Sequence, residues 1–466
     1  MIKNYLILSL LCSFIGFSQF NPSAPWTKKS GTASLSQQTI DEQVDAFEAY
    51  WSSRNKNVRA AGYKPFMRWE YHWRNYQNEQ GYVMSSSDFW NAWRQKNNVK
   101  ASRNTTLSLP TSNWQPVGPF SHTNTGSWSS GQGRVNIVHV DPSNPNTLYL
   151  GAPAGGIWKS IDNGTTWTPL TDELPQIGVS GIAVDYSNSN VIYISTGDKD
   201  AGDSYSVGVY KSIDGGLTWD ATGVMGTSNP GRAGDIIIHP TNNQILWCAT
   251  DKGIYKTTNA GNSWSRVQTG NFSQGNIRLK ADDSSTLFAV SKNGFFRSTN
   301  GGDSFTQITA GLPENSARLI LDVTPANSNY IYILSSTTGH YFQGIYRSTD
   351  AGVSFTATNT TTNVFENDGQ ASQSWFDLAL AVSNTNENEI YTGCLNVWKS
   401  NNGGETITKI NNWRRPSSAS YTHADIHYLG FHGTKLFAGT DGGIYVSENN
   451  GVNFTDLTAG AQISQF

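Results

Sequence analysis

Short segments in which apolar and polar residues alternate recur along most of the chain. Residues 135–140 alternate, a polar turn follows at 141–144, and residues 147–150 form a second apolar segment. The segments 182–184 and 191–194 repeat this arrangement further along the chain. Such alternation is typical of β-strands, and polar turns of this kind join neighbouring strands. The pattern therefore predicts a fold built from consecutive β-hairpins.

A second pattern returns seven times, in which an apolar or aromatic strand ends in Ser or Thr and a tight turn and another strand follow. The eight-residue copies, which we call boxes, begin at Ser160, Ser212, Thr257, Ser298, Ser348, Ser400 and Ser447. Successive boxes start 41 to 52 residues apart, which is the period of one four-stranded propeller blade. Residues 113–466 are therefore predicted to form an all-β, seven-bladed β-propeller, or a larger propeller that is cut short.

Three positions of each box have a structural explanation. The third position carries Asp162, Asp214, Asn259, Asn300, Asp350, Asn402 and Asn449. An Asp or Asn oxygen accepts backbone N–H groups of its own turn, and the Gly at the fifth position allows a positive φ. The eighth position is apolar and anchors the hairpin. Since Asn does not ionise, the boxes are predicted to fasten turns rather than to bind calcium or to catalyse.

The segment 19–112 carries no box and is predicted to be helical. Residues 39–55 have helical apolar spacing, with Thr39 as the N-cap and Glu42 three residues later in a capping box. The predicted elements are helices at 39–55, 63–78 and 86–96, and a linker at 102–112.

Residues 1–18 are predicted to be a signal peptide. Lys3 precedes an apolar run that is too short to cross a membrane, and the small Ser18 suits cleavage. No later segment could span a membrane, so we expect a soluble protein that is secreted or held at the cell surface. Cys248 and Cys394 lie in different repeats, and we expect two buried free thiols.

Composition excludes one class of partner. Charged residues make up 14% of the chain, the net charge is −3, and there is no basic run. Nucleic acid is therefore not an expected partner. The expected partner is an extracellular glycan or protein, and no cofactor is predicted. The oligomeric state stays open.

His423, Asp425 and His427 form the strongest polar constellation. Alternation predicts that all three side chains lie on one face of an innermost strand, near the central channel. Asp377 is predicted on the innermost strand of the preceding blade. These residues could form a metal or acid–base site, but a hydrogen-bonded network is favoured, and no metal site is predicted. Asp377 and Asp425 are the candidate catalytic residues, and Arg134, His423 and His427 are the candidate ligand-binding residues.

The boxes resemble those of the BNR/Asp-box superfamily, which includes bacterial sialidases, sortilin-type propellers and xyloglucan-cleaving glycosidases. Longer stretches are similar to sortilin-like secreted propellers of Bacteroidetes. These stretches are residues 62–70, 114–119, 133–135, 155–160, 396–400 and 441–445. That resemblance implies further blades or modules and a C-terminal domain for type IX secretion. The chain is therefore expected to be a fragment or a shortened gene product, with Ile463 opening another strand.

The superfamily's enzyme signatures are incomplete here. Sialidases clamp a carboxylate with three arginines, but Arg134 and Arg232 share a repeat phase that Arg318 does not, and a fourth arginine is Arg278. A sialidase is therefore not expected. The xyloglucanase-like Thr-Asp-Val-Gly-Gly signature is missing from the first blade, where residues 151–156 carry no acid.

Two functions from different classes remain. The favoured one is a non-catalytic, sortilin-like propeller that binds glycan or protein ligands. The alternative is a glycoside hydrolase that acts on extracellular polysaccharide with Asp377 and Asp425, on two neighbouring blades, as its carboxylate pair.

Overall fold

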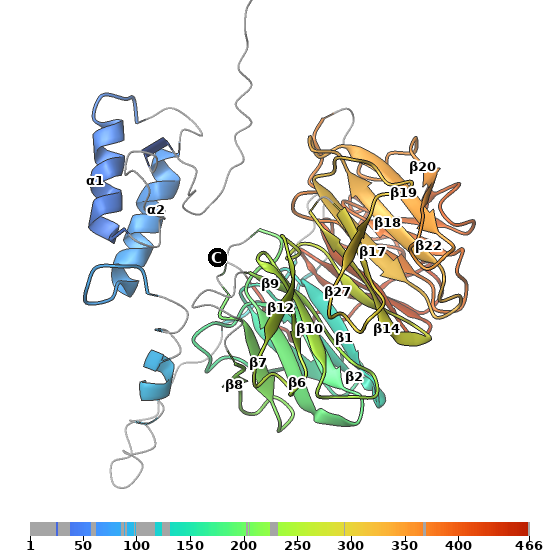
Figure 1. The fold of residues 1–466 in the computed structure, drawn as a ribbon, viewed down its shortest axis with the longest axis horizontal. Coiled ribbons are helices and arrows are strands. Elements are labelled where there is room, and N and C mark those ends of the chain that lie inside the picture. Colours follow the sequence, from blue (N-terminus) through green and yellow to red (C-terminus); the bar gives the residue numbers. More distant parts are fainter. Residues whose placement is uncertain are drawn as a thin grey trace, which may run out of the picture. The chain divides into compact units, whose positions relative to one another are not determined.

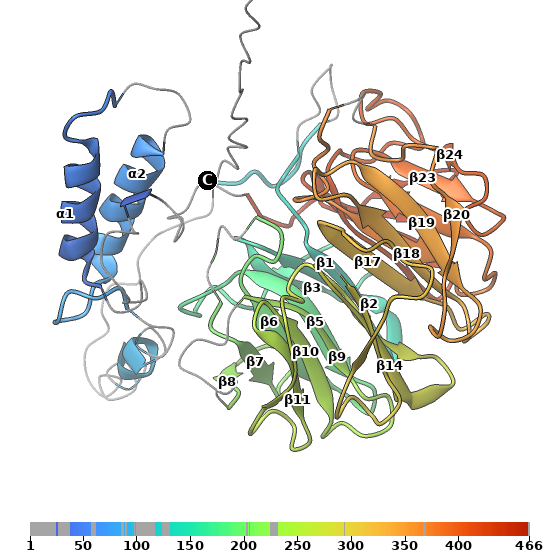
Figure 2. The ribbon, with the colours of Figure 1, turned by 45° about the horizontal axis from the view of Figure 1, so that its top comes forward.

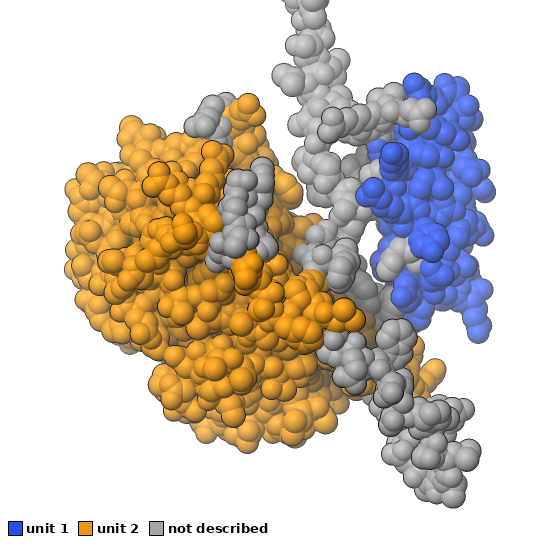
Figure 3. All heavy atoms as spheres, turned by 180° about the vertical axis from the view of Figure 1, so that it is seen from behind, with its two compact units in different colours: residues 1–89 blue, residues 90–466 orange. Residues whose placement is uncertain are grey.

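The chain forms two compact units, residues 1–89 and 90–466, which Figure 3 colours separately. The computed structural model describes residues 25–26, 38–56, 62–84, 88, 91–96, 98, 117–123, 131–201, 204, 206–223, 232–292, 294–366 and 370–464. The predicted signal peptide and linker lie outside these residues. The three named helices belong to the first unit, and all strands belong to the second.

The first unit contains the helices α1 (Ile40–Trp51), α2 (Tyr63–Trp73) and the 3-10 helix η3 (Arg74–Tyr76), of which Figure 1 labels α1 and α2. The predicted capping box is confirmed, because Thr39 and Glu42 each accept the backbone N–H of the other. The core of this unit consists of Trp26, Ile40, Val44, Phe47, Trp51, Phe66 and Trp69. The aromatic stripes of the two helices therefore bury one another.

The second unit is a seven-bladed β-propeller, as predicted (Figures 1 and 2). Each blade is a sheet of four consecutive antiparallel strands. The first strand of each blade packs against the first strand of the next, and β25 packs against β1. The seven blades therefore close into a ring whose innermost strands line the axis.

The first four blades contain the following strands. They are β1 (Ile137–Asp141), β2 (Asn144–Ala152), β3 (Gly156–Ser160), β4 (Thr168–Pro169), β5 (Val179–Asp185), β6 (Asn188–Thr196), β7 (Val209–Ser212), β8 (Asp220–Ala221), β9 (Ala233–Ile238), β10 (Leu246–Thr250), β11 (Gly253–Thr257), β12 (Ser265–Thr269), β13 (Ile277–Lys280), β14 (Asp283–Ser291), β15 (Gly294–Ser298) and β16 (Thr306–Ile308).

The fifth, sixth and seventh blades follow in the same order. They contain β17 (Arg318–Val323), β18 (Ile331–Ser336), β19 (Phe342–Ser348), β20 (Thr356–Asn359), β21 (Ala379–Val382), β22 (Ile390–Gly393), β23 (Val397–Ser400), β24 (Thr408–Lys409), β25 (Ile426–His432), β26 (Lys435–Thr440), β27 (Gly443–Ser447) and β28 (Thr455–Asp456).

Each box forms the turn between the third and fourth strands of its blade. In the second blade, Asp214 accepts the backbone N–H of Thr218 at 2.9 Å, and Ser212 accepts the N–H of Gly216 at 2.8 Å. The other six boxes repeat both bonds. All seven box glycines have positive φ, as predicted. The boxes therefore have the turn-fastening geometry expected from the sequence.

The eighth position of a box also connects neighbouring blades, which the sequence did not reveal. The indole of Trp219 donates to Leu170 O, in the preceding blade, at 2.8 Å. The indole of Trp167 in the first blade donates to Leu457 O at 2.7 Å, and Leu457 follows the last strand of the seventh blade. The repeat therefore joins the two ends of the ring with the contact that it uses inside the ring.

Two backbone hydrogen bonds reinforce this closure. The N–H of Val135 donates to Thr440 O, and the N–H of Gln132 donates to Gly442 O, both at 2.9 Å. The segment before β1 therefore runs along the end of β26 and the turn that follows it. Neither Gly131 nor Gly133 has room for a side chain, since an added Cβ would lie 2.3 Å from the Cα of Gly442 and 2.1 Å from the backbone oxygen of Ile463, respectively.

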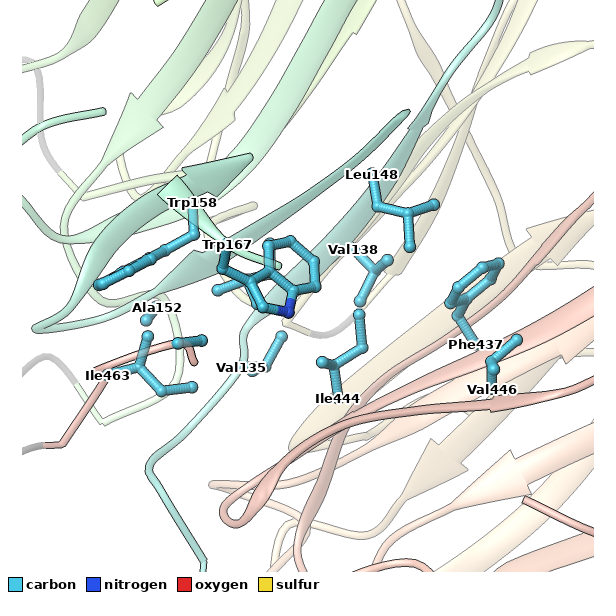
Figure 4. Close-up of a cluster of buried hydrophobic side chains, with 12 residues drawn as sticks. Val135, Val138, Leu148, Ala152, Trp158, Trp167, Phe437, Ile444, Val446 and Ile463 are labelled. Atoms are coloured by element: carbon cyan, nitrogen blue, oxygen red, sulfur yellow. The ribbon is translucent and has the colours of Figure 1, made fainter. Parts of the chain in front are cut away.

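Apolar side chains of the first and seventh blades form one buried cluster at the closure (Figure 4). Ile463, which was expected to open another strand, lies in this cluster outside any strand. The hydroxyl of Ser464 donates to Gln132 O at 2.9 Å. The residues up to 464 therefore pack onto the first blade, because that interface buries the apolar side chain of Ile463.

Other expectations have mixed outcomes. Residues 91–96 are helical, as predicted, but they belong to the second unit, where Trp93 donates to Glu173 O at 2.6 Å. Cys248 and Cys394 are buried and free, as predicted. In the described part of the chain, no helix combines the length and the apolar character that a membrane span requires.

Replacing Asp214 by Ala should destabilise the propeller by about 1 kcal/mol, because the Thr218 N–H loses its acceptor. Asp214→Asn is the matched control, since four other boxes carry Asn at this position, and it should keep most of the stability. Urea unfolding of the purified chain measures both. Equal stability of wild type and the Ala variant would contradict the role assigned to this side chain.

Replacing Gly133 by Ala should open the ring closure, because the new Cβ overlaps Ile463 O. Gly433→Ala is the control, since Gly433 also has positive φ but a Cβ added there would meet nothing within 4 Å. The Gly133 variant should lose at least about 2 kcal/mol more unfolding free energy than the control. Equal losses, measured by urea unfolding, would mean that this close approach does not constrain the ring.

Candidate functional site

Charged side chains gather at the end of the ring axis where the innermost strands begin. They come from the starts of innermost strands and from the turns between second and third strands. They are Arg134, Asp198, Asp200, Arg318, His427 and Asp441, and we call them the axial network.

Asp200 is the centre of this network. One carboxylate oxygen accepts from Arg318 Nη2 at 2.7 Å, and the other contacts His427 Nδ1 at 2.9 Å. The three residues belong to the second, fifth and seventh blades, and none of their side chains is more than 2% exposed. A buried charge is costly unless it is paired, so Asp200 ties three blades together across the axis.

His427 is a buried imidazolium. Its Nε2 lies 2.9 Å from Asp441 Oδ1, so a carboxylate faces each ring nitrogen. Burial alone would lower the pKa of His427, but the hydrogen bonds to Asp200 and Asp441 raise it to about 9. Burial likewise opposes ionisation of Asp200, yet Arg318 and His427 hold its pKa well below the usual range. Both groups are therefore charged at neutral pH.

Arg134 forms the second buried ion pair. Its Nη2 donates to Asp198 Oδ2 at 2.9 Å, and the guanidinium lies 5.0 Å from the ring centre of Phe376. The same ring meets His427 edge-to-face, with ring centres 4.7 Å apart. Phe376 therefore lies against two cationic side chains, which attract the face of an aromatic ring.

The loop before β21 is fastened to this network by its backbone. Arg318 Nη1 donates to Ser374 O at 3.3 Å and to Phe376 O at 3.1 Å. Gln274 Nε2 donates to Trp375 O at 2.9 Å and also to Asp200 O. The Trp375 side chain is 43% exposed. The loop therefore holds an exposed aromatic ring next to the axial network.

Asp425 is a half-buried carboxylate at the edge of the network. It accepts from Gln373 Nε2 at 3.0 Å, and its backbone oxygen accepts the N–H of Asp441 at 3.1 Å. Burial and the nearby carboxylate of Asp441 raise the pKa of Asp425, although His427 partly opposes them. Asp425 can therefore keep a proton at a pH where an ordinary carboxyl has lost it.

Asp377 lies close to Asp425 but is fully buried. Its Oδ1 accepts a hydrogen bond from Cys394 Sγ at 3.5 Å, and its Oδ2 has no partner among the described residues. Burial, followed by the charge of Asp425, raises the pKa of Asp377 well above its ordinary value. The two candidate catalytic residues are thus close enough to interact electrostatically, and Asp377 is the more deeply buried of the two.

The prediction that His423, Asp425 and His427 lie on one strand face is wrong. Strand β25 begins at Ile426, so the first two residues precede it. Asp425 has a φ of 60°, which reverses the backbone and ends the alternation. The His423 ring lies against Gly442, and its Nδ1 is 3.1 Å from Ala424 O. Only His427 takes part in the axial network.

The four inner arginines do not converge. Arg134 and Arg318 pair with buried carboxylates of the network, and Arg232 lies 3.7 Å from Asp251. Arg278 lies between two other carboxylates further along the axis. Because each guanidinium already has an acidic partner, the described arginines do not form the carboxylate clamp of a sialidase.

Sequence reasoning missed Asp198 and Asp200 and gave Asp441 no role. All three lie in turns between the second and third strands of a blade. The corresponding stretch of the first blade, residues 151–156, contains no acidic residue. The recurrence of acidic residues at this repeat position was the feature of the sequence that could have identified them. Their partners come from distant blades, so sequence spacing gave no indication of the pairing.

The network does not have the form of a metal centre. Both ring nitrogens of His427 contact carboxylates, which leaves no lone pair for a metal. Across the part of the chain that the structure describes, no group of three or more His, Cys, Asp or Glu side chains is placed to hold a metal ion. The contacts are those of a hydrogen-bonded network.

No family model matches the chain. The chain is 30% identical to a xyloglucanase of Acetivibrio thermocellus over 152 residues, which is 30% of this chain and 18% of that protein. A xyloglucanase of Paenibacillus sp is 26% identical over 151 residues, 30% of this chain and 15% of that protein. The chain therefore matches a minor part of each curated relative.

Solved structures share the fold. A GH74 xyloglucanase from Xanthomonas campestris superposes with a TM-score of 0.54 and 15% identity, over 72% of this chain and 56% of that one. A GH74 enzyme from Niastella koreensis gives a TM-score of 0.51 and 18% identity, with the same coverage. At this identity the likeness concerns the fold alone. The curated xyloglucanase relatives favour the glycoside hydrolase alternative over the sortilin-like binding role preferred from the sequence.

The stability of the chain should fall between about pH 6.5 and pH 9 because of His427. The pKa of His427 is about 9 in the folded chain and 6.5 in the unfolded chain. Its contribution to the free energy of unfolding is therefore complete below pH 6.5 and is lost as the pH rises through about 9. Urea unfolding across this range measures the fall.

Two variants isolate the histidine. His427→Gln should remove this fall, and Asp441→Asn should move it to lower pH because one of the two carboxylates is gone. A pH dependence equal to that of wild type in both variants would contradict a charged His427.

Proposed function

We propose that this propeller is a glycoside hydrolase that cleaves an extracellular polysaccharide of the xyloglucan type. The proposal is supported by the neighbouring carboxylates of Asp425 and Asp441, by the exposed Trp375 on the loop next to them, and by the similarity to xyloglucanases. Because the chain matches only part of those proteins, the substrate is taken from them as a hypothesis for this chain.

A comparison within the chain supports the assignment of the carboxylates. Asp251 in the third blade and Asp441 in the seventh each follow the second strand, and each donates its N–H to the residue before the innermost strand. In the third blade that residue is Arg232, which pairs with the acid. In the seventh blade it is Asp425. Two carboxylates thus stand where the third blade has an ion pair.

Asp425 is proposed as the proton donor. A general acid in glycoside hydrolysis needs a raised pKa, and burial with a neighbouring carboxylate raises the pKa of Asp425. It would give its proton to the oxygen of the bond that breaks. Gln373, which donates to one of its oxygens, would hold the carboxyl in place.

Asp441 is proposed as the second carboxylate. Its side chain is 29% exposed, and one oxygen is held by His427 while the other has no hydrogen bond to a described residue. This second oxygen could accept a proton from water or attack the sugar carbon directly. Asp377, which the sequence suggested as the partner of Asp425, is fully buried. It is proposed to position Asp425 rather than to touch substrate.

Trp375 is proposed to bind the polysaccharide. Exposed aromatic rings offer flat apolar area at low entropic cost, and the backbone of Trp375 is fixed by Gln274. A polymer lying on this ring would be next to the loop that also carries Gln373 and Asp377. The proposed location is extracellular, supported by the signal peptide predicted at residues 1–18 and by the polymeric substrate.

Asp425→Asn should lower kcat/KM for xyloglucan about 100-fold or more, because Asn cannot donate a proton. Release of reducing sugars from xyloglucan measures the effect. Asp441→Asn should cause a comparable loss. Asp251→Asn, at the matching position of the third blade, is the control and should leave activity unchanged.

Three results would contradict this proposal. Wild-type protein that retains xyloglucan without releasing sugar would instead support the binding role. Equal activity of Asp425→Asn and wild type would remove Asp425 as the proton donor. Equal effects of Asp251→Asn and Asp441→Asn would mean that the loss reflects the fold rather than the chemistry.

A further inference from the structure

A second site lies at the other end of the axis. A cavity of about 420 Å³ opens where the innermost strands end, and all seven innermost strands contribute to its lining. Neither the axial network nor Asp377 or Asp425 lines it. Its volume falls in the range of small-molecule sites, about 300–1,000 Å³. The cavity is therefore distinct from the site proposed for hydrolysis.

Arg278 is the main donor in this cavity. Its Nη1 contacts Asp235 at 2.5 Å and its Nε donates to Asp322 at 3.2 Å. These two carboxylates raise the pKa of Arg278 despite its burial. The side chain is still 25% exposed, and its Nη2 makes no hydrogen bond with any described residue. Along one wall of the cavity, the donor guanidinium of Arg278 thus lies between the acceptor carboxylates of Asp235 and Asp322.

A neutral cluster forms another wall. The hydroxyl of Tyr428 lies 2.9 Å from His432 Nε2, and His139 Nε2 is buried without a partner in the described part of the chain. Burial lowers the pKa of His432 to about 3 and that of His139 to about 4. Both imidazoles are therefore uncharged at neutral pH, so Tyr428 donates to His432 and its oxygen stays open as an acceptor.

The charges of the lining select against charged ligands. The charged side chains of the lining already have partners. Arg278 lies between the carboxylates of Asp235 and Asp322, and the ammonium of Lys280 binds Asp282 and Ser328, which are outside the lining. An anion would meet the carboxylates of Asp235 and Asp322, and a cation would meet the guanidinium of Arg278. A hydroxyl group both donates and accepts, so neighbouring hydroxyls match adjacent donors and acceptors.

We propose that this cavity is a binding site for a small neutral polyhydroxylated molecule such as a monosaccharide. The hydroxyls bind Arg278, its two carboxylate partners and Tyr428, and the apolar strand residues Ile237 and Val382 cover the ring. This proposal does not depend on the proposed hydrolase activity.

The test is isothermal titration calorimetry of the full chain with glucose and with its charged analogues glucuronate and glucosamine. At about pH 6 an amino sugar is mostly protonated. Glucose should bind with a dissociation constant on the order of 1 mM, as its size allows. Each charged analogue should bind at least about tenfold more weakly, because each meets like charges.

Two matched variants locate the site. Ala281 is exposed at the rim of the cavity, and Ala357 is exposed on the outermost strand β20. Ala281→Trp should block the mouth and abolish glucose binding while the unfolding temperature stays unchanged. Ala357→Trp should bind as wild type does. Asp425→Asn should also keep glucose binding, whatever it does to hydrolysis, because it lies at the other end of the axis.

Four results would contradict part or all of this proposal. Absence of glucose binding to wild type would overturn the proposal, and so would unchanged binding in Ala281→Trp. Equal binding of glucose and of either charged analogue would overturn the argument from charge. Loss of binding in Asp425→Asn would place the sugar at the hydrolase site instead.

Discussion

The buried carboxylate of Asp200 is the contact on which the centre of this propeller depends. Its oxygens bind Arg318 and His427, which lie on blades that are far apart in the sequence. A single carboxylate cannot be removed without leaving two buried cations, so the network is stable only when it is complete. The same constraint orients the surrounding groups, since His427 holds Asp441 and Arg318 holds the loop that carries Trp375.

The periphery of the ring is held in a different way. There each box repeats the hydrogen bonds of its own turn, and the indoles of Trp167 and Trp219 each bind the residue that follows the outer strand of the blade before. Because Trp167 makes this contact with the seventh blade, ring closure needs no special device at that point. The apolar cluster that includes Ile463 then buries the remaining surface between the two blades. Periodic contacts thus build the ring, and non-periodic charged contacts fix its axis.

This division explains what could be predicted from the sequence. The blades follow from the box spacing, and the capping box follows from Thr39 and Glu42, because these signals are local. The partners of Asp200 could not be predicted, since the repeat does not indicate which blades meet across the axis. The predicted alternation around Asp425 failed for a local reason, namely a φ of 60° at a residue that is not glycine. Polar residues near the axis were found, but their pairing required three-dimensional structure.

The two ends of the axis differ because their charges are arranged differently. Near the strand starts, Phe376 contacts Arg134 and His427, and the carboxyl groups of Asp377, Asp425 and Asp441 lie near one another. Burial and these neighbouring carboxylates raise the pKa values of Asp377 and Asp425, which suits proton transfer. Near the strand ends, Arg278 is paired with two carboxylates and the buried histidines are neutral, so the open volume is lined by polar groups that already have charged partners or carry no charge. One set of seven strands therefore carries a site suited to acid–base chemistry at one end and a site suited to an uncharged ligand at the other.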